Sequence, residues 1–254
     1  MTEAVYTRNI AVGRGAAKVA LPITVVTPDE LTKLLPTIQK ANPDIVEWRL
    51  DFLEKWQDDA TLVEISSSIR QAFPETPIIG TYRTKEEGGK QTIRPADYER
   101  ILKRLAELPV DMVDVEINRD ASIVEEAVKA IHQLDKIVIA SFHDFNNTPS
   151  TEQLENTFNK MQAAKADVLK VAVMPHTTED VLQLMTFSQQ AARKYKEPIV
   201  TMAMGQLGSV TRVATHITHS AITFACLTKE QASAPGQIEI NNLRGIQHTL
   251  EGDS

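Results

Sequence analysis

Short apolar runs rich in valine and isoleucine alternate along the whole chain with longer stretches in which apolar residues recur at helical spacing. The short runs predict strands at Ile23–Val26, Ile45–Asp51, Ile78–Thr84, Met112–Ile117, Ile137–His143, Val168–Val173, Ile199–Met204 and Ile222–Leu227. The longer stretches predict helices between them at Asp29–Lys40, Ala60–Phe73, Ala96–Leu108, Ser122–Leu134, Thr151–Lys165 and Glu179–Tyr195. Capping residues, proline and acids at positions 28–30, 150–152 and 178–180 agree with helix starts there.

Strands that are nearly continuous in apolar residues and separated by helices are typical of a parallel sheet covered by helices. About eight such units in 254 residues fit barrel closure, so the sequence predicts an α/β fold of the (β/α)8 TIM-barrel class. We expect residues 1–254 to form one catalytic barrel domain, with a hairpin over Tyr6–Leu21 closing its bottom. A doubly wound open sheet is the alternative, and the lack of a Gly-x-Gly-x-x-Gly sequence after an early strand disfavours it.

Charged residues occupy alternate positions inside several predicted strands. In the second strand Trp48 and Leu50 share one face, which leaves Glu47, Arg49 and Asp51 on the other. Because the apolar face suits the helices outside, the charged face points into the barrel. The same alternation places further polar side chains inside, namely Thr81, Arg83, Asp114, Glu116, Ser141, His143 and Lys170.

A charged layer inside a barrel has two interpretations. Isolated buried charges cost on the order of several kcal/mol each, so the groups either pair with one another or meet a polar ligand. Asp51 with Arg49, or Asp114 with a strand lysine, could form a closed ion-pair lattice without any chemistry. Barrel active sites lie at the carboxyl ends of the strands, and His143 and Lys170 lie at or near such ends, which favours a ligand site.

Several short segments together carry a family resemblance. They are Glu47-Trp48-Arg49-Leu50-Asp51, Arg83 followed by Glu87-Gly88-Gly89, Ser141-Phe142-His143-Asp144-Phe145, Asp167 with Lys170, Met204-Gly205 through Gly208 to Arg212, and Ser233-Ala234-Pro235-Gly236-Gln237. With these segments in this order, the chain resembles the type I 3-dehydroquinate dehydratases of the shikimate pathway nearly end to end. Two departures are visible: Thr211 stands where a serine often precedes the arginine, and two acids, Glu86 and Glu87, stand where one is expected. We assign the family's glutamate to Glu87, with Glu86 as the alternative.

The resemblance implies a reaction and a role for each matching residue. Lys170 would form an imine with the C3 ketone of 3-dehydroquinate, while His143 would remove a proton from C2 and then protonate the departing C1 hydroxyl. Arg212 would hold the substrate carboxylate, with Ser233 and Gln237 closing over it from a lid loop. The remaining matching residues would hold ring hydroxyls and orient the catalytic pair, namely Glu47, Arg49, Arg83 and Glu87. The implied product is 3-dehydroshikimate, and the implied assembly is a homodimer.

The residue types suit this chemistry. A protonated imine acidifies the carbon beside it, so neither a metal nor an organic cofactor is expected. An unperturbed lysine, with a pKa of about 10.4, is almost entirely charged at pH 7, so the site must lower that pKa. Desolvation by Val168 and Ala172 acts in that direction, as do nearby arginines. The acids of the inner layer act against it, and the sequence leaves the sum open.

Composition and charge exclude other classes. A formal net charge of −7 argues against nucleic acid as a partner. Cys226 is the only cysteine and lies in an apolar run, where a buried structural thiol is expected. Met1–Arg14 lacks the pattern of a secretory signal and no window nears the length of a membrane span, so a cytoplasmic location is expected. The histidines besides His143 lack metal-ligand company and are expected to be structural, namely His132, His176, His216, His219 and His248.

Alternatives remain at the level of function and of single residues. A lysine-dependent barrel of the aldolase or transaldolase type would share Lys170 but cleave a phosphorylated sugar, and a catalytically inactive barrel could bind a metabolite. His143 could be a core histidine bonded to Asp144 or to a backbone carbonyl. The segment Gly205–Gly208 could cradle a phosphate, and Ala232–Gln237 could be an ordinary turn.

Overall fold

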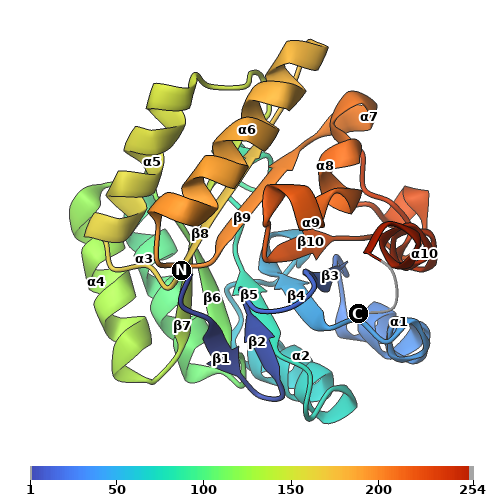
Figure 1. Ribbon diagram of the computed structural model, residues 1–254. Helices are drawn as coiled ribbons and strands as arrows, with labels where there is room; N and C mark the ends of the chain where they lie inside the picture. The colour runs from blue at the N-terminus through green and yellow to red at the C-terminus, as the bar shows by residue number, and fades with distance from the viewer. Residues whose placement is uncertain (1, 252–254) are drawn as a thin grey trace.

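Eight parallel strands form one curled sheet with helices around its outside in the computed structural model, which describes residues 2–251 (Figure 1). The strands are β3 (Lys18–Ile23), β4 (Ile45–Arg49), β5 (Ile78–Thr81), β6 (Met112–Glu116), β7 (Ile137–Asp144), β8 (Val168–Val173), β9 (Ile199–Ala203) and β10 (Ile222–Phe224). Their order in the sheet is β10, β3, β4, β5, β6, β7, β8 and β9. The predicted (β/α)8 barrel fold is therefore confirmed.

The seam between β9 and β10 is bridged by hydrogen bonds at the ends of the two strands. The backbone N–H of Ala221 donates to the carbonyl of Ile199 at 2.7 Å. The backbone N–H of Thr201 donates to Oγ of Ser220 at 3.1 Å. These bonds bring the two outermost strands of the sheet together, so that the barrel is nearly closed and its interior is separated from the helices.

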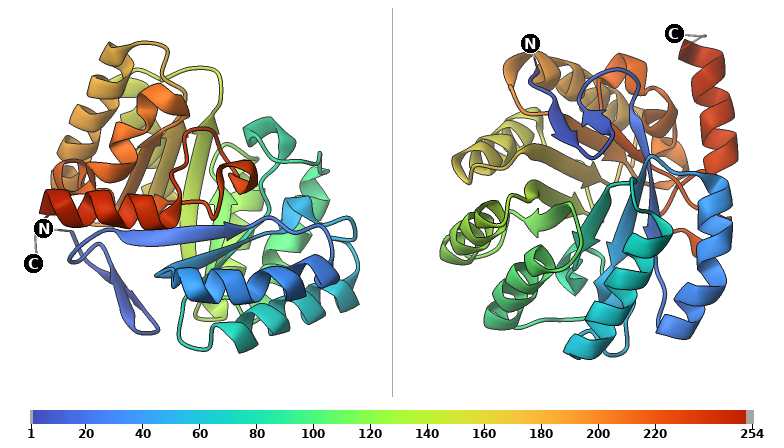
Figure 2. Two further views of the ribbon diagram at one scale, coloured as in Figure 1. Left: turned by 90° about the vertical axis from the view of Figure 1, so that its right-hand side faces the viewer. Right: turned by 90° about the horizontal axis from the view of Figure 1, so that it is seen from below.

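The helices follow the strands in alternation and pack around the barrel (Figure 2). The longer ones are α1 (Pro28–Ala41), α2 (Asp59–Ala72), α3 (Pro95–Glu107), α4 (Ala121–Gln133), α5 (Thr151–Ala163), α6 (Thr178–Lys194) and α10 (Ile240–Glu251). Short segments are α7 (Gly205–Gly208), α8 (Val210–Val213), α9 (Thr215–Thr218) and the 3-10 turns η1 (Leu50–Phe52), η2 (Lys85–Glu87) and η3 (Lys229–Gln231). Capping boxes at Ser150 and Thr177 begin α5 and α6. The predicted start of α5 is thus correct, and that of α6 lies one residue too late.

The N-terminal hairpin is present but shorter than predicted. It consists of β1 (Val5–Thr7) and β2 (Ile10–Val12), which pair antiparallel. Val12 is buried against the apolar cluster inside the barrel, and Arg8 donates to Asp111 at 2.7 Å, directly before β6. The hairpin therefore closes the amino end of the barrel, the end that faces the viewer in the right-hand view of Figure 2.

The predicted first strand, Ile23–Val26, is wrong. The observed strand is β3, which ends at Ile23. Its residues Lys18 to Leu21 belong to this strand and not to the predicted hairpin. Pro22 lies inside β3, and a proline argues against a central strand because it cannot donate to the ladder. Beyond β3 the backbone N–H of Val26 donates to Oε2 of Glu30 at 2.8 Å, so this segment belongs to the start of α1 and not to the sheet.

The barrel interior has an apolar lower layer and a polar upper layer. The apolar layer includes Ala20, Ile45, Ile79, Met112, Ile139, Val168, Val200 and Ile222. Two residues farther along the strands the same inward face carries charge, as Glu47 follows Ile45 and Lys170 follows Val168. Strand register aligns these polar positions into two rows, namely Arg49, Thr81 and Asp114 across β4 to β6, and Glu116, Ser141 and Lys170 across β6 to β8. The fold thus places a charged layer on an apolar floor.

The aromatic contact between α5 and α6 offers a test of the outer core. Phe158 is fully buried, and its ring centroid lies 5.1 Å from that of Phe187 and 5.3 Å from that of Tyr195. We expect Phe158→Ala to lower the free energy of unfolding by about 3–5 kcal/mol in chemical denaturation. The control Leu182→Ala removes a side chain that is 58% exposed and should change it by less than about 0.5 kcal/mol. Equal effects of the two substitutions would contradict the packing described.

Candidate active site

All nine residues of the predicted site line one cavity at the carboxyl ends of the strands. They are Glu47, Arg49, Arg83, Glu87, His143, Lys170, Arg212, Ser233 and Gln237. The wall also contains residues that the sequence analysis did not assign to the site, namely Gly88, Phe145, Ala172, Met202, Met204, Phe224 and Ala234. Met202 and Phe224 follow the period-two pattern of β9 and β10, which could have revealed them. Phe145 and Met204 lie in loops, where no such pattern exists.

Lys170 projects from β8 into the barrel interior. Its side chain is 6% exposed, and Nζ donates to Oδ2 of Asp114 at 3.1 Å. Oε1 of Glu47 lies 3.9 Å from the same nitrogen, and the ring centroid of Phe224 lies 4.5 Å from it. The amine is therefore enclosed between two carboxylates and one aromatic face, at the edge of the cavity.

Asp114 is shared between Lys170 and Arg83. Nη2 of Arg83 donates to Oδ1 of Asp114 at 2.6 Å, and Oγ of Ser141 donates to the same oxygen at 2.6 Å. Burial alone would raise the pKa of Asp114, but the charges of Arg83 and Lys170 hold it well below its usual range. Because one carboxylate serves two cations, Lys170 is not locked into a pair of its own.

The ion-pair interpretation holds for one part of the charged layer. Nε and Nη2 of Arg49 donate to the two carboxylate oxygens of Asp51, both at 2.8 Å. Asp51 is fully buried and also accepts from the backbone N–H of Lys90 at 3.2 Å. This pair therefore ties the end of β4 to the loop after β5, the loop that carries Glu87.

His143 forms a hydrogen-bonded pair with Glu87. Nδ1 of His143 lies 2.9 Å from Oε2 of Glu87, and the backbone N–H of His143 donates to the same oxygen at 3.0 Å. Glu87 ends η2, and Gly88 after it has a φ of 87°, a conformation that favours glycine. Asp144 accepts instead from the backbone of its own turn, and the Glu86 side chain is 56% exposed. Of the two neighbouring acids, Glu87 is the one at the cavity.

The environment moves the two pKa values of this pair in opposite directions. Burial, with a further contribution from Glu116, raises the pKa of Glu87 to about 8. Burial, together with the charges of Arg83 and Lys170, lowers the pKa of His143 well below 6.5. These two shifts favour a protonated Glu87 carboxyl beside a neutral His143 imidazole at neutral pH. Since Nδ1 is committed to Glu87, Nε2 is the nitrogen left for a ligand.

Arg212 on α8 is buried, with 1% exposure, and has carbonyls as its oxygen partners. Nη1 donates to the carbonyl of Phe224 at 3.3 Å and Nη2 to that of Pro235 at 3.2 Å. Within residues 2–251 no carboxylate pairs with this guanidinium, and its Nε has no acceptor. Burial lowers its pKa to about 10. A buried guanidinium without a counter-ion is a strong site for an anion.

The segment with Ser233 and Gln237 covers the cavity. The backbone N–H of Ser233 donates to Oε1 of Gln237 at 2.8 Å, and Nε2 of Gln237 donates to Oγ of Ser233 at 3.0 Å. Gly236 lies so close to Gly205 that a Cβ on it would be 2.2 Å from the carbonyl oxygen of Gly205. The N–H of Gly205 is occupied by the carbonyl of Pro235 at 3.1 Å, which argues against the phosphate-cradling alternative.

The covering segment leaves little space. The cavity volume is about 50 Å³. Small-molecule sites usually measure roughly 300–1,000 Å³, so this cavity is smaller than a typical ligand site.

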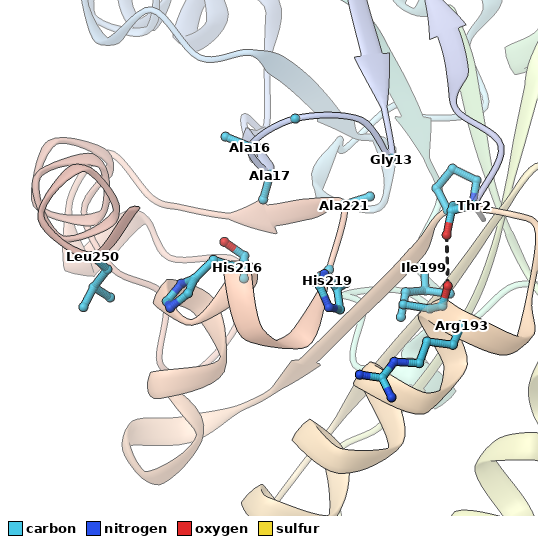
Figure 3. A pocket seen from close by; sticks show the side chains of 15 residues that line it. Thr2, Gly13, Ala16, Ala17, Arg193, Ile199, His216, His219, Ala221 and Leu250 are labelled. Atoms are coloured by element: carbon cyan, nitrogen blue, oxygen red, sulfur yellow. Dashed lines mark hydrogen bonds between the residues drawn. The ribbon is translucent and has the colours of Figure 1, made fainter. Parts of the chain in front are cut away.

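Besides a hollow of about 470 Å³ lined by residues of α10, two larger hollows lie away from these charged groups. One, of about 700 Å³, lies at the amino end of the barrel, where Figure 3 shows Arg193, His216 and His219 in its wall. All three side chains are exposed. The other, of about 880 Å³, lies between α4 and α5. Neither gathers buried charges, and within residues 2–251 no cluster of histidine, cysteine and acidic side chains could hold a metal ion.

A buried amine, a histidine–carboxyl pair and an unpaired guanidinium at the carboxyl ends of barrel strands are typical of a barrel enzyme. Comparison with known proteins identifies the family. The family described as type I 3-dehydroquinase matches residues 19–254. This chain is 37% identical over 245 residues to the 3-dehydroquinate dehydratase of Lactiplantibacillus plantarum, an alignment that covers 96% of each protein. The chain therefore belongs to the type I 3-dehydroquinase family.

Solved structures agree with this assignment. The type I 3-dehydroquinate dehydratase of Clostridium difficile, solved with covalently modified comenic acid, is 32% identical with a TM-score of 0.93, and the match covers 98% of both chains. The 3-dehydroquinate dehydratase of Geobacillus kaustophilus is 31% identical with a TM-score of 0.94, over 99% of this chain and 98% of the other. At this identity the resemblance extends beyond the fold to the family.

The raised pKa of Glu87 makes stability depend on pH. A carboxyl whose pKa is about 8 when folded and about 4.5 when unfolded binds more protons in the folded state between these values, so stability falls as the pH rises toward 8. We expect the free energy of unfolding to drop by about 1 kcal/mol more in the wild type than in Glu87→Gln between pH 7 and pH 9. Chemical denaturation at both pH values measures this. The control, Glu75→Gln at an exposed acid, should follow the wild type. The same loss in Glu87→Gln as in the wild type would contradict the shift.

Proposed function

We propose that this chain is a 3-dehydroquinate dehydratase, a lyase that converts 3-dehydroquinate to 3-dehydroshikimate and water in the shikimate pathway to chorismate and aromatic amino acids. Relatives with that name match it over at least 96% of its length. The observation that carries the proposal is that Lys170, His143 and Arg212 meet at one cavity at the carboxyl ends of the strands. Dehydration of a carboxylated ring ketone through an imine needs a nucleophilic amine, a proton carrier and an anion holder.

Lys170 is proposed to act as a neutral amine. Its ammonium first loses a proton, and Glu47 at 3.9 Å is the neighbouring acid that is not already shared with Arg83. The nitrogen then bonds to C3 as the ketone π bond breaks, and the oxygen takes one proton from the amine and the released proton back from the acid. It leaves as water, which gives a protonated imine. Phe224, with its ring centroid 4.5 Å from Nζ, stabilises the positive charge in both states.

His143 is proposed to carry the proton between C2 and the leaving group. When Glu87 is ionised, Nδ1–H donates to it and Nε2 carries the lone pair that removes a proton from C2, beside the imine. The electron pair of that C–H bond forms the C1–C2 double bond, and the C1 hydroxyl takes the proton from Nε2 and leaves as water. Hydrolysis of the product imine then restores the ketone and frees Lys170.

Arg212 is proposed to bind the substrate carboxylate. Its oxygen partners among the described residues are neutral carbonyls. An incoming substrate carboxylate would therefore be its first anionic partner. Ser233 and Gln237 lie on the covering segment and would add hydrogen bonds from above. The ring hydroxyls would be held by the charged layer, namely Glu47, Arg49, Arg83 and Glu87. Because the cavity is about 50 Å³, this segment must move away for substrate to enter.

Three expectations from the sequence stay predictions. They are the single barrel domain over residues 1–254, the homodimer and the cytoplasmic location. Within residues 2–251, none of the helices has both the length and the apolar composition that crossing a membrane requires.

The lysine and histidine roles separate in one assay. With 3-dehydroquinate as substrate, formation of the conjugated enone is followed by ultraviolet absorbance. We expect Lys170→Met to abolish turnover, because no other described amine lines the cavity. His143→Ala should lower kcat by about 10²–10⁴-fold and still form the imine.

The same assay separates the alternatives. A near-normal rate in His143→Ala would exclude the proton-carrying role. Wild-type protein that binds 3-dehydroquinate in calorimetry but forms no enone would indicate a binding barrel. Turnover of a phosphorylated sugar in its place would indicate an enzyme of the aldolase type.

Removing the Arg212 guanidinium should affect substrate binding and stability in opposite ways. We expect Arg212→Met to raise KM by roughly 10–100-fold, because a hydrogen bond to a charged group contributes about 1.5–3 kcal/mol. The same substitution should leave the ligand-free protein as stable as the wild type or more stable, because it removes a buried charge that no carboxylate compensates. Enzyme kinetics and thermal unfolding measure the two effects. An unchanged KM would show that the carboxylate binds elsewhere.

A further inference from the structure

The second acid of the Glu86–Glu87 pair has a partner outside the cavity. Arg119 lies three residues after the end of β6, and its side chain is 22% exposed. Nη2 of Arg119 donates to Oε2 of Glu86 at 3.1 Å and also contacts Oγ1 of Thr84. Nε of Arg119 donates to Oε2 of Glu116 at 2.9 Å. One guanidinium therefore joins the η2 turn to the end of β6.

Glu116 is the buried counterpart of this bridge. Its side chain is fully buried, and Oε1 accepts from Nη1 of Arg83 at 3.0 Å and from the backbone N–H of Thr84 at 2.8 Å. Oε2 accepts from Oγ1 of Thr84 at 2.7 Å and from Arg119. Both oxygens are thus engaged, and Glu116 fixes the start of the segment that leads to Glu87.

Two adjacent acids of the η2 turn have side chains that point to opposite sides of the turn. Glu86 lies on the outer side with Arg119, and Glu87 lies on the inner side with His143. A three-residue turn transmits a displacement of one residue to the next, because its backbone has few rotatable bonds between them. Holding Glu86 and Thr84 therefore fixes the carboxyl of Glu87 within hydrogen-bond distance of Nδ1.

We propose that Arg119 is a positioning residue for the His143–Glu87 pair, and that its hydrogen bond to Glu86 holds the η2 turn in place. This proposal rests on the proposed function, in which that pair moves the proton. Arg119 does not line the cavity and touches no substrate in this account. It acts through Glu86, Thr84 and Glu116.

Arg119 also has an electrostatic effect on the pair. The charged groups that face Glu87 are Arg83, two residues after the end of β5, Asp114 and Glu116 on β6, and His143 on β7. Glu116 favours the protonated form of Glu87, and Arg119 partly offsets the charge of Glu116. Loss of Arg119 should therefore raise the pKa of Glu87 and make the base form of the pair scarcer at pH 7.

A purely structural role would give a different result. Exposed and partly exposed ion pairs contribute a median of about 0–1 kcal/mol to stability, so the Arg119–Glu86 pair adds little to folding. The buried Glu116 keeps Arg83 and Thr84 as partners when Arg119 is removed. A displaced general base, by contrast, can cost up to about 10²-fold in rate. The proposal therefore requires a large change in kcat with a small change in stability.

The variants are Arg119→Met, which keeps the aliphatic stem, Arg119→Lys, which keeps the charge, and Glu86→Ala. We expect Arg119→Met to lower kcat by roughly 10-fold or more. KM should stay within about threefold, because no substrate contact is lost. Arg119→Lys should restore part of the rate. Combining Arg119→Met with Glu86→Ala should lower kcat little further, because both substitutions break the same Arg119–Glu86 contact. The control Arg104→Met breaks exposed ion pairs with Asp59 and Glu107 and should leave kcat unchanged.

A second measurement does not depend on turnover. The carboxyl carbon of Glu87 is followed by NMR in protein labelled at glutamate, with its signal assigned by its loss in Glu87→Gln. The titration midpoint should lie near 8 in the wild type, higher in Arg119→Met, and near 8 in Arg104→Met. An unmoved midpoint together with unchanged kcat in Arg119→Met would overturn the proposal, as would a loss of kcat matched by unfolding. Wild-type protein without turnover would refute the proposed function, while the NMR result would still decide the role of Arg119.

Discussion

The site depends on the contacts between the buried guanidinium of Arg83 and the acids around it. This guanidinium contacts Asp114 and Glu116 on β6 and Ser141 on β7, and lies 3.6 Å from Glu87 on the turn after β5. Charges inside a barrel are stable only when opposite charges compensate them. The Arg83 guanidinium therefore holds the acids of β6 and the hydroxyl of β7 in fixed positions relative to each other. It leaves Lys170 with a shared carboxylate and His143 with one committed nitrogen. Compensation is therefore complete for the framework and incomplete for the groups that are proposed to do the chemistry.

The rigid and the movable parts of the site lie on different elements. Lys170, His143 and the acids beside them lie on strands or on a turn fixed by Asp51 and Glu116, where their positions are set before substrate arrives. Ser233 and Gln237 lie on a segment whose side chains bond to each other, and the proposed function requires this segment to move when substrate enters. This division suits a reaction that needs fixed proton carriers and a closed, water-poor cavity.

The period-two pattern predicted the inward charges because side-chain direction in a strand is set by backbone geometry alone. It failed at β3, where Pro22 inside the strand resembles a strand boundary, and the sequence alone cannot show that its missing N–H is tolerated. The pattern predicted that Lys170 has acids near it, but not that Asp114 is divided between two cations. The bridge from Arg119 to Glu86 joins residues 33 apart in sequence, and no local signal encodes it.

The amine of Lys170 is proposed to be the nucleophile of this barrel. The most direct test is to incubate the wild-type protein with 3-dehydroquinate and borohydride, digest it, and locate the reduced adduct by mass spectrometry. We expect a single modified peptide with the adduct on Lys170, formed also in His143→Ala. An adduct on another lysine, or none in a protein that still turns over substrate, would contradict it.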